Sequence, residues 1–411
     1  MHRDAVSRRN LTALLAVFLL AAFGIAAQAV NPAVLTTGFG LSLSILAMYL
    51  TINNPCACMD SLTGLNDKQY LLRRMNELTD AHKAFHIITV YAYQLDHMNK
   101  VSGVQSGDEF LRRAAEHMQE IAGRNVFRVT GKRFLLLTFS LREYEACLTS
   151  LRQVFHTQPD DAQAAPSPVI LCGVVGAEKL GTGGLVLDYA EYLESLAARS
   201  GGTEVIQNDR KNRDSFYYNK QVEQFLHRAI DEDLFEVYYQ PVYSLHQQRF
   251  VTLEALSRLR HPTLGWISPD IFIRLAEKNR LISQITELQL RRVCRFLREN
   301  PALRASIANV KINLSPLDLI HSDGGSHLIR ILDEYGLPYS CFQFEITETV
   351  ATEYSVSLTR VAESFQAAGI GLCLDDFGSG YANLNTVMQL PFSVIKLDRS
   401  LLFHICTDKN A

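Results

Sequence analysis

Two adjacent aspartates, Asp375 and Asp376, end a short apolar run and stand directly before the glycine-punctuated turn at 377–380. Adjacent carboxylates repel each other, so a fold that keeps both ionised in one place usually supplies a cation. The small residues of the turn let the backbone come close to a ligand. A solvated turn after a strand explains an isolated Asp-Asp pair as well, so the assignment depends on other acids placed in the same way.

Further side chains of this kind lie near the ends of other strand-like runs. They are Glu254 in 250–256, Asn313 in 310–315, Glu345 and Glu348 in 342–348, and Lys396 in 394–398. Oxygen ligands near the ends of successive strands, with helical segments between them, are typical of the active face of a (β/α) barrel. Hard oxygen donors favour Mg²⁺ or Mn²⁺ over zinc.

The second half of the chain also carries an ordered series of motifs. They are YQP at 239–241, EALSR at 254–258, HPTLGWISP at 261–269, AE at 276–277, NLS at 313–315, EITE at 345–348, DDFGSGY at 375–381 and KLDRS at 396–400. With these motifs the chain from about residue 218 onward resembles the EAL domain, a cyclic di-GMP phosphodiesterase module. The resemblance implies an α/β fold, a TIM-like barrel, and a reaction that opens cyclic di-GMP to linear pGpG.

The resemblance also implies a metal site with two ions, Mg²⁺ or Mn²⁺. Glu254, Asn313, Glu345 and Asp375 would ligate the first ion, and Asp376 would hold the second with Asp375 as the bridge. Two divalent cations ~3.5–4 Å apart suit the hydrolysis of a phosphodiester, because both the attacking and the leaving oxygen are stabilised.

The remaining roles concern catalysis and substrate binding. By resemblance, Glu348 would support the metal site, and Lys396 would orient the attacking water or offset charge on the phosphoryl oxygens. Gln240 and Arg258 would contact the guanine and phosphate groups of cyclic di-GMP. Taken alone, Lys396 is equally a surface lysine and Arg258 an ion-pair partner, so the joint occurrence of the motifs supports these assignments.

A second set of motifs lies upstream. It consists of DSLTGLN at 60–66, a β-like run at 85–92, SGDEFL at 106–111, a strand pair around 128–139, an apolar strand at 168–175 and a terminal helix near 187–200. Over about residues 59–205 the chain resembles the GGDEF domain, which makes cyclic di-GMP from two molecules of GTP.

The residues that carry the chemistry of that family are altered. Where the family has Gly-Gly-Asp/Glu-Glu-Phe, the chain has Thr-Gly-Lys-Arg-Phe at 130–134, so that Lys132 and Arg133 replace acids. The metal-binding Asp aligns with Gln94, Asp108 keeps one guanine-reading position, and the guanine-reading Asn has no clear counterpart. Because triphosphate chemistry needs a divalent cation, we expect no cyclase activity. Two roles stay open: GTP binding as a regulatory input, and a structural or dimerising domain.

Length and composition narrow the possible classes of protein. A length of 411 residues predicts two or three domains, and a net charge of −3 gives no basic footprint for nucleic acid. The 8 cysteines have no disulfide-framework spacing, which indicates reduced thiols in a cytosolic compartment.

The N-terminal segment is apolar. No charged residue occurs from Asn10 to Met59, and Asn31-Pro32 separates two apolar segments at about 11–30 and 33–52. Each has ~20 residues, enough to cross ~30 Å of hydrocarbon, so a transmembrane hairpin is expected. Arginines at 3, 8 and 9 place the N-terminus and the later domains in the cytoplasm, at the inner membrane. A cleavable signal peptide followed by a single anchor is the alternative.

We therefore expect an anchor at 1–53, an altered GGDEF domain at 54–205, a linker at 206–222 and an EAL domain at 223–411. Only six strand-like runs are visible in the last part, so the barrel is expected to lack its last strands and the enzyme to be impaired. The predicted protein is a membrane-anchored, homodimeric cyclic di-GMP phosphodiesterase with a regulatory GGDEF domain. The alternative is a non-catalytic receptor for cyclic di-GMP or GTP.

Overall fold

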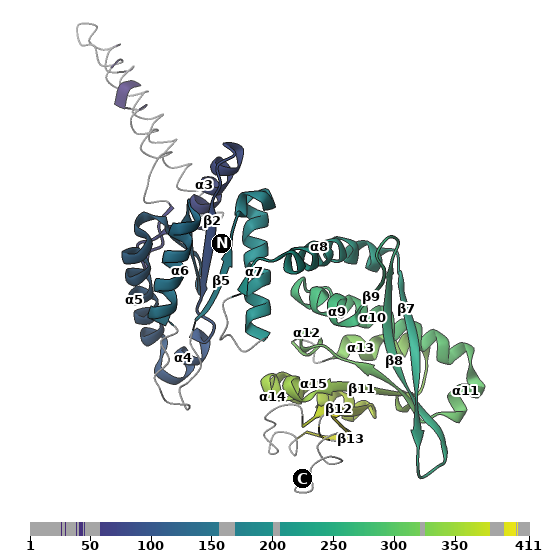
Figure 1. Cartoon of the computed structure of the whole chain (residues 1–411). Coiled ribbons are helices and arrows are strands. Elements are labelled where there is room, and N and C mark those ends of the chain that lie inside the picture. Colours follow the sequence, from purple (N-terminus) through teal and green to yellow (C-terminus); the bar gives the residue numbers. More distant parts are fainter. Residues whose placement is uncertain are drawn as a thin grey trace. The chain divides into compact units, whose positions relative to one another are not determined.

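The chain folds into two compact units, residues 1–214 and 215–411, which are described separately (Figure 1). The computed structural model describes residues 58–155, 169–199, 206–320, 325–378, 390–399 and 401, with isolated helical positions between 26 and 45. No helix in this described part is both long and apolar enough to span a bilayer. The predicted hairpin at 1–53 falls almost entirely outside the described residues and stays a prediction.

The first unit is built on one mixed sheet with the strand order β1-β3-β4-β2-β5-β6. The strands are β1 (Asn66–Asp67), β2 (His86–Tyr91), β3 (Val126–Thr130), β4 (Arg133–Thr138), β5 (Ile170–Val174) and β6 (Ile206–Gln207). β2 runs antiparallel to both of its neighbours, β4 and β5. The sequence predicted β2, the β3–β4 pair and β5 from their apolar, β-branched composition, and all are confirmed.

Helices pack on both sides of this sheet (Figure 1). They are α3 (Lys68–Asp80), α4 (Leu95–Ser102), α5 (Val104–Ala122), α6 (Leu141–Phe155) and α7 (Gly183–Arg199). Asp67 caps α3 by accepting hydrogen bonds from the backbone amides of Gln69 and Tyr70 at 2.9 and 3.0 Å. The helix predicted near 187–200 is α7, which begins four residues earlier, at Gly183.

The second unit contains a sheet with the order β13-β12-β11-β10-β8-β7, and β9 pairs with β8. The strands are β7 (Phe235–Ser244), β8 (Arg249–His261), β9 (Gly265–Ile267), β10 (Asn309–Asn313), β11 (Phe342–Thr347), β12 (Gly371–Phe377) and β13 (Phe392–Leu397). All six predicted strands are confirmed, whereas β9 was not predicted. Strands β8 and β10 to β13 are parallel, and β7 is antiparallel to β8. Among the described residues, β7 and β13 are the two edges of an open sheet.

Helices cover one face of the second sheet. They are α9 (Pro269–Lys278), α10 (Ile282–Glu299), α11 (Pro301–Ser306), α12 (Pro316–Leu319), α13 (Ser326–Tyr335), α14 (Glu348–Glu353) and α15 (Ser355–Ala368). The core between helices and sheet includes Ala255, Ile312, Phe344 and Leu374 from four neighbouring strands. Because side chains alternate along a strand, the residues next to these point to the opposite face.

The linker predicted at 206–222 is largely helical. Helix α8 (Arg210–Asp231) begins at Arg210, inside the predicted linker, and continues beyond it to Asp231. The polar residues at its start suit a helix end, because the carboxylate of Asp209 accepts a hydrogen bond from the amide of Asn212 at 2.6 Å. Arg210 and Asp214 then form an exposed ion pair one turn apart at 3.7 Å.

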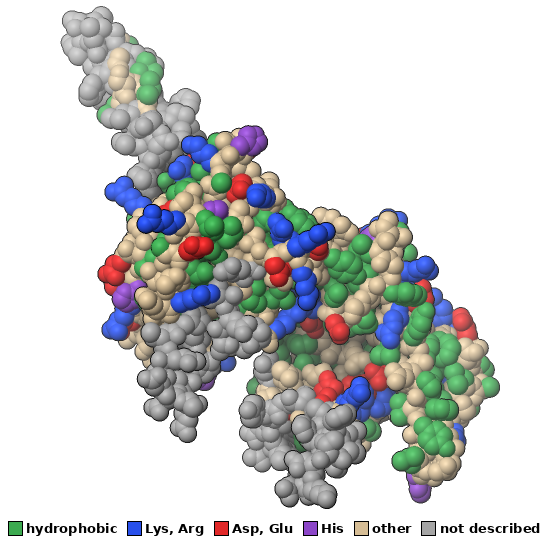
Figure 2. Space-filling model, viewed as in Figure 1, with side chains coloured by type: hydrophobic (Ala, Val, Ile, Leu, Met, Phe, Trp, Pro, Cys, Tyr) green, Lys and Arg blue, Asp and Glu red, His purple; other side chains and the backbone are tan. Residues whose placement is uncertain are grey.

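Figure 2 shows acidic and basic side chains interspersed on the visible face, with hydrophobic side chains gathered over the β7–β8 hairpin. The most exposed of these are Leu245 and Phe250, at 81% and 57% of their full exposure. They lie at and beside the turn of the hairpin, next to the exposed Tyr243.

The first unit offers a sharp test of its packing at Gly173 in β5. A Cβ atom placed there would lie 1.8 Å from the hydroxyl oxygen of the buried Tyr144. We expect Gly173→Ala to lower the free energy of unfolding of this unit by about 1–3 kcal/mol, measured by urea denaturation, because the core is overpacked. In a Tyr144→Phe background the cost should be smaller, since the hydroxyl is gone. An equal cost in both backgrounds would show that this contact does not limit the packing.

Candidate active site

Polar side chains gather on the face of the second sheet that points away from its core. The register pairs Glu254 of β8 with Lys311 of β10, and Asn313 of β10 with Glu345 of β11. Glu345 in turn pairs with Cys373 of β12, two residues before Asp375. Because paired residues on adjacent strands share a face, these side chains form one polar layer. The sequence predicted that the acids would meet at one end of the strands, and the strand register is consistent with this.

Lys396 of β13 is the centre of this layer. Its Nζ donates hydrogen bonds to Asp375 Oδ2 at 2.9 Å, to Glu345 Oε2 at 3.1 Å and to Glu254 Oε2 at 3.2 Å. Burial alone would lower the pKa of Lys396, but the hydrogen bond to Asp375 and the charges of Glu345 and Glu254 outweigh burial and raise it. Lys396 is therefore a fixed cation that offsets the repulsion among three carboxylates from three strands.

Asn313 and Asp376 lie at the edge of the same cluster. The amide of Asn313 donates to Glu254 Oε1 at 3.4 Å, which is a long hydrogen bond. Asp376 is exposed and its backbone has a φ of +57°, a left-handed conformation that is uncommon for a non-glycine residue. Partial burial and the negative charges of Asp375 and Asp398 raise the pKa of Asp376. A nearby cation would therefore stabilise the charged form of the Asp376 carboxylate.

Glu348 holds the turn that follows β12. It is the first residue of α14, is only 2% exposed, and accepts a hydrogen bond from the backbone amide of Gly378 at 2.5 Å. Glu348 thereby ties the turn that follows Asp375 and Asp376 to α14, the helix after β11.

Gln240 and Arg258 occupy β7 and β8, beside the acids. Gln240 pairs directly with Glu254 across the two strands, which places both on the same face.

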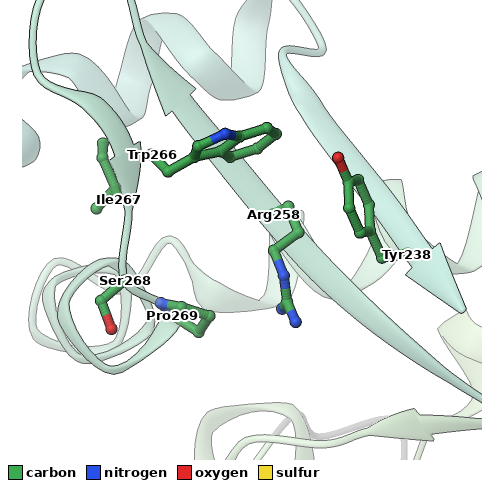
Figure 3. Close-up of a pocket in the computed structure, with 6 residues that line it drawn as sticks. All are labelled: Tyr238, Arg258, Trp266, Ile267, Ser268 and Pro269. Atoms are coloured by element: carbon green, nitrogen blue, oxygen red, sulfur yellow. The ribbon is translucent and has the colours of Figure 1, made fainter. Parts of the chain in front are cut away.

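Arg258 lines a cavity of about 440 Å³ with Tyr238, Trp266, Ile267, Ser268 and Pro269 (Figure 3). Its guanidinium carbon lies 5.8 Å from the centre of the Tyr238 ring, and the Tyr238 and Trp266 rings meet edge to face at 6.0 Å. The sequence interpretation missed both aromatic residues, although Tyr238 precedes Gln240 by two positions on the same strand.

A second lysine of the polar layer was also missed. Lys311 of β10 is buried, and its Nζ donates to Glu345 Oε1 at 3.0 Å. Glu345 therefore has one oxygen on Lys311 and the other on Lys396. The signal was present in the sequence, since Lys311 is the one charged residue of the predicted run 310–315 and lies between two apolar residues.

The donor chemistry of this layer fits a divalent cation. Carboxylate oxygens of Glu254, Glu345 and Asp375 already converge on a single cationic atom, the Nζ of Lys396. Hard oxygen donors of this type suit Mg²⁺ or Mn²⁺. Within the described residues, no group of three or more His, Cys, Asp or Glu side chains has a metal-binding arrangement. The three acids point at the ammonium group of Lys396, so cation binding requires Lys396 to withdraw.

In the first unit, the two cations that replace acids are paired internally. Lys132 forms an ion pair with Asp96, and Arg133 bonds to Glu194 of α7 through its Nε at 2.7 Å and its Nη2 at 2.6 Å. Glu194 is 2% exposed. Burial would lower the pKa of Arg133, but the charge of Glu194 raises it. The charge of Arg133 is thus compensated by the protein itself.

The structure places Gln94 outside strand β2. β2 ends at Tyr91, and Gln94 lies beyond it, as the residue that precedes α4. The residue of β2 that faces Arg133 is Tyr91, and the guanidinium carbon lies 5.6 Å from the centre of its ring. Gln94 therefore lies between β2 and α4 and not on the strand itself, and its assignment to the position of the metal-binding Asp stays a prediction.

Asn99 is a further residue that the sequence interpretation passed over. It lies on α4, and a Cβ atom on Gly107 of α5 would lie 2.0 Å from its Oδ1. This oxygen is buried and has no hydrogen-bond partner among the described residues. Asn99 therefore lies beside Gly107, the neighbour of the predicted guanine-reading residue Asp108.

Comparison with known proteins agrees with both resemblances. The family profile "Diguanylate cyclase, GGDEF domain" matches residues 57–181, and the profile "EAL domain" matches residues 223–411. The chain is 29% identical over 369 residues to "Cyclic di-GMP phosphodiesterase NbdA" of Pseudomonas aeruginosa, covering 84% of this chain and 45% of that protein. It is 26% identical over 371 residues to a second protein of that organism, "Cyclic di-GMP phosphodiesterase PA2567", covering 83% of this chain and 60% of the other.

A solved structure shares the fold. The S helix-GGDEF-EAL portion of LapD from Vibrio cholerae, bound to c-di-GMP, superimposes with a TM-score of 0.58 at 14% identity, covering 90% of this chain and 88% of that chain. The chain spans about half the length of the first curated relatives that it matches, at 43%, 45% and 51%. The order of the matched domains and the acids at the strand ends lead to one assignment: the chain belongs to the GGDEF–EAL family, with a GGDEF domain followed by an EAL domain.

Proposed function

We propose that the EAL domain hydrolyses cyclic di-GMP to linear pGpG. The observation that carries this proposal is the convergence of Glu254, Glu345 and Asp375, from three strands, on Lys396 of a fourth strand. Relatives named cyclic di-GMP phosphodiesterases support the choice of substrate. A cluster of acids that can hold a cation suits phosphodiester hydrolysis, which needs positive charge beside the phosphate and a polarised water.

Each residue of the site would have its own role in this reaction. Glu254, Asn313, Glu345 and Asp375 would hold one Mg²⁺ or Mn²⁺ ion, and Asp376 with Asp375 a second. The bound ions would lower the pKa of a water molecule and offset the phosphate charge. Water attacks phosphorus, the bond from phosphorus to the 3′-oxygen breaks, and that oxygen takes up a proton. Lys396, once released from the acids, would donate hydrogen bonds to the phosphoryl oxygens or the attacking water.

Substrate contacts would come from β7, β8 and β9. The cavity beside Arg258 is walled by Tyr238 and Trp266, whose rings provide flat apolar surface next to a guanidinium donor (Figure 3). Such a combination suits a purine base linked to a phosphate. Gln240, next to Glu254, would donate to the same nucleotide.

We propose that the GGDEF domain makes no cyclic di-GMP and serves a regulatory or structural role. Arg133 is held by the buried Glu194, and Lys132 by Asp96, so neither charge is available for a triphosphate. Tyr91 opposite Arg133 provides no carboxylate for a metal ion. This arrangement favours a structural role over GTP binding through these two cations.

Anchoring is a further proposal. The uncharged segment 10–59 and the arginines that precede it support an inner-membrane hairpin with both domains in the cytoplasm. The predicted homodimer stays a prediction. Reporter fusions after Arg9 and Asn66 would both give a cytoplasmic signal if the hairpin forms.

Removing individual acids tests the proposed site. We expect Glu254→Gln and Asp375→Asn to lower the rate of pGpG formation with Mn²⁺ by about 10²–10⁴-fold, because each loses a cation ligand. The rate is measured by chromatography of the nucleotides. Glu299→Gln, at the exposed end of α10, is the matched control and should keep the wild-type rate. Equal rates in all of these proteins would show that Glu254 and Asp375 are not needed for the reaction.

The assignment of the first unit has its own test. Incubation of the protein with GTP and Mg²⁺ should yield no cyclic di-GMP, because Lys132 and Arg133 stand where the family has acids and Gln94 stands where it has a metal-binding Asp. An active diguanylate cyclase assayed in parallel provides the positive control. Protein-dependent synthesis of cyclic di-GMP would contradict the proposal.

A further inference from the structure

Lys311 is a buried lysine that the proposed reaction does not use. Its side chain is 6% exposed, and it lies one strand away from Glu254 and one strand away from Glu345. Its Nζ contacts Glu345 Oε1 at 3.0 Å and Cys373 Sγ at 3.7 Å. A lysine is rarely buried unless its charge is paired, and Glu345, with a side chain that is 0% exposed, is the acid that pairs it.

The two lysines bound to Glu345 differ in their freedom to move. Lys396 lies on the edge strand β13, its side chain is 29% exposed, and it bridges three acids. Lys311 lies on the interior strand β10, and its side chain is 6% exposed. When a divalent cation binds the acids, Lys396 can turn toward water, whereas Lys311 would lose its counter-ion. The contact between Lys311 and Glu345 Oε1 should therefore persist with a cation bound.

We propose that Lys311 is a positioning residue that sets metal selectivity: it occupies one oxygen of Glu345, so that only the other oxygen can ligate a cation. This inference rests on the proposed function, because it takes Glu345 as a metal ligand. It adds that Glu345 binds through Oε2 alone and cannot chelate with both oxygens.

Single-oxygen ligation discriminates between cations of different size. Mg²⁺ and Mn²⁺ accept one oxygen from each carboxylate in an octahedral arrangement, whereas Ca²⁺ takes about 6–8 oxygens and often binds both oxygens of a carboxylate. A site whose buried acid offers one oxygen therefore disfavours Ca²⁺. Loss of the lysine would free Oε1, and the gain would be larger for Ca²⁺ than for Mn²⁺. General repulsion by the lysine charge acts on both dications alike, so it cancels in the ratio of their affinities.

The test compares the affinities of Mn²⁺ and Ca²⁺ for the full chain and for Lys311→Met, which keeps the length of the side chain and removes its charge. Both are measured by calorimetry without substrate. We expect the preference for Mn²⁺ over Ca²⁺ to fall by about tenfold in Lys311→Met, a typical size for the loss of a group that orients a ligand. Lys68→Met, at the exposed start of α3, removes the same charge elsewhere and should keep the wild-type preference.

An unchanged ratio in a Lys311→Met protein that melts as cooperatively as the wild type would overturn the inference. A second measurement covers the case in which that variant does not fold. In a crystal structure of the wild-type chain with Mn²⁺, Lys311 Nζ should stay within hydrogen-bond distance of Glu345 Oε1, and Glu345 should bind through Oε2 alone. A Glu345 that chelates Mn²⁺ with both oxygens would overturn the inference as well.

These outcomes are separable from those of the proposed function. Cation binding with the expected ratio but without any pGpG would leave the selectivity role of Lys311 standing and contradict catalysis. Catalysis with an unchanged ratio in Lys311→Met would contradict only the role of Lys311. A wild-type chain that binds neither ion at these acids would overturn both.

Discussion

Electrostatic compensation of a group of carboxylates is the constraint on which the second unit depends. Glu254, Glu345 and Asp375 come from β8, β11 and β12, and their negative charges are held together by Lys396 from β13. Without a cation the acids would repel each other at this distance. Because each group belongs to a different strand, the cluster exists only when the sheet has formed. Folding and assembly of the proposed site are thus the same event.

Charges are compensated in the first unit as well, but there the compensation leaves no site for a cation. There, Arg133 and Glu194 form an ion pair between β4 and α7, at the position where the family has acids. The pair compensates itself and leaves no unbalanced charge for a metal ion or a phosphate. In the EAL unit the acids outnumber the lysines that touch them, which favours binding of a further cation. The different charge balance of the two sites explains why we assign chemistry to one of them only.

Much of the architecture could be predicted from the sequence. The apolar, β-branched runs located all six main strands of the second sheet, and the acids at their ends indicated a shared site before any register was known. These features are local, so the order of residues along the chain specifies them.

What could not be predicted depends on contacts between distant segments. The partnership of Lys311 with Glu345 requires the register of β10 on β11, which no run of residues reveals. The position of Tyr91 opposite Arg133 depends in the same way on the pairing of β2 with β4. β9 has only three residues and was missed because its strand character comes from its pairing with β8. The start of α8 was missed because polar residues at a helix end resemble those of a linker.

The central claim is that this acid cluster directs water onto the phosphorus of cyclic di-GMP. It is tested most directly by incubating the protein with cyclic di-GMP and Mn²⁺ in ¹⁸O-labelled water and analysing the nucleotides by mass spectrometry. We expect pGpG with one ¹⁸O atom, located in its 5′-phosphate, because water supplies the new oxygen of that group. Tight binding of cyclic di-GMP without any labelled pGpG would contradict the account and identify the chain as a receptor.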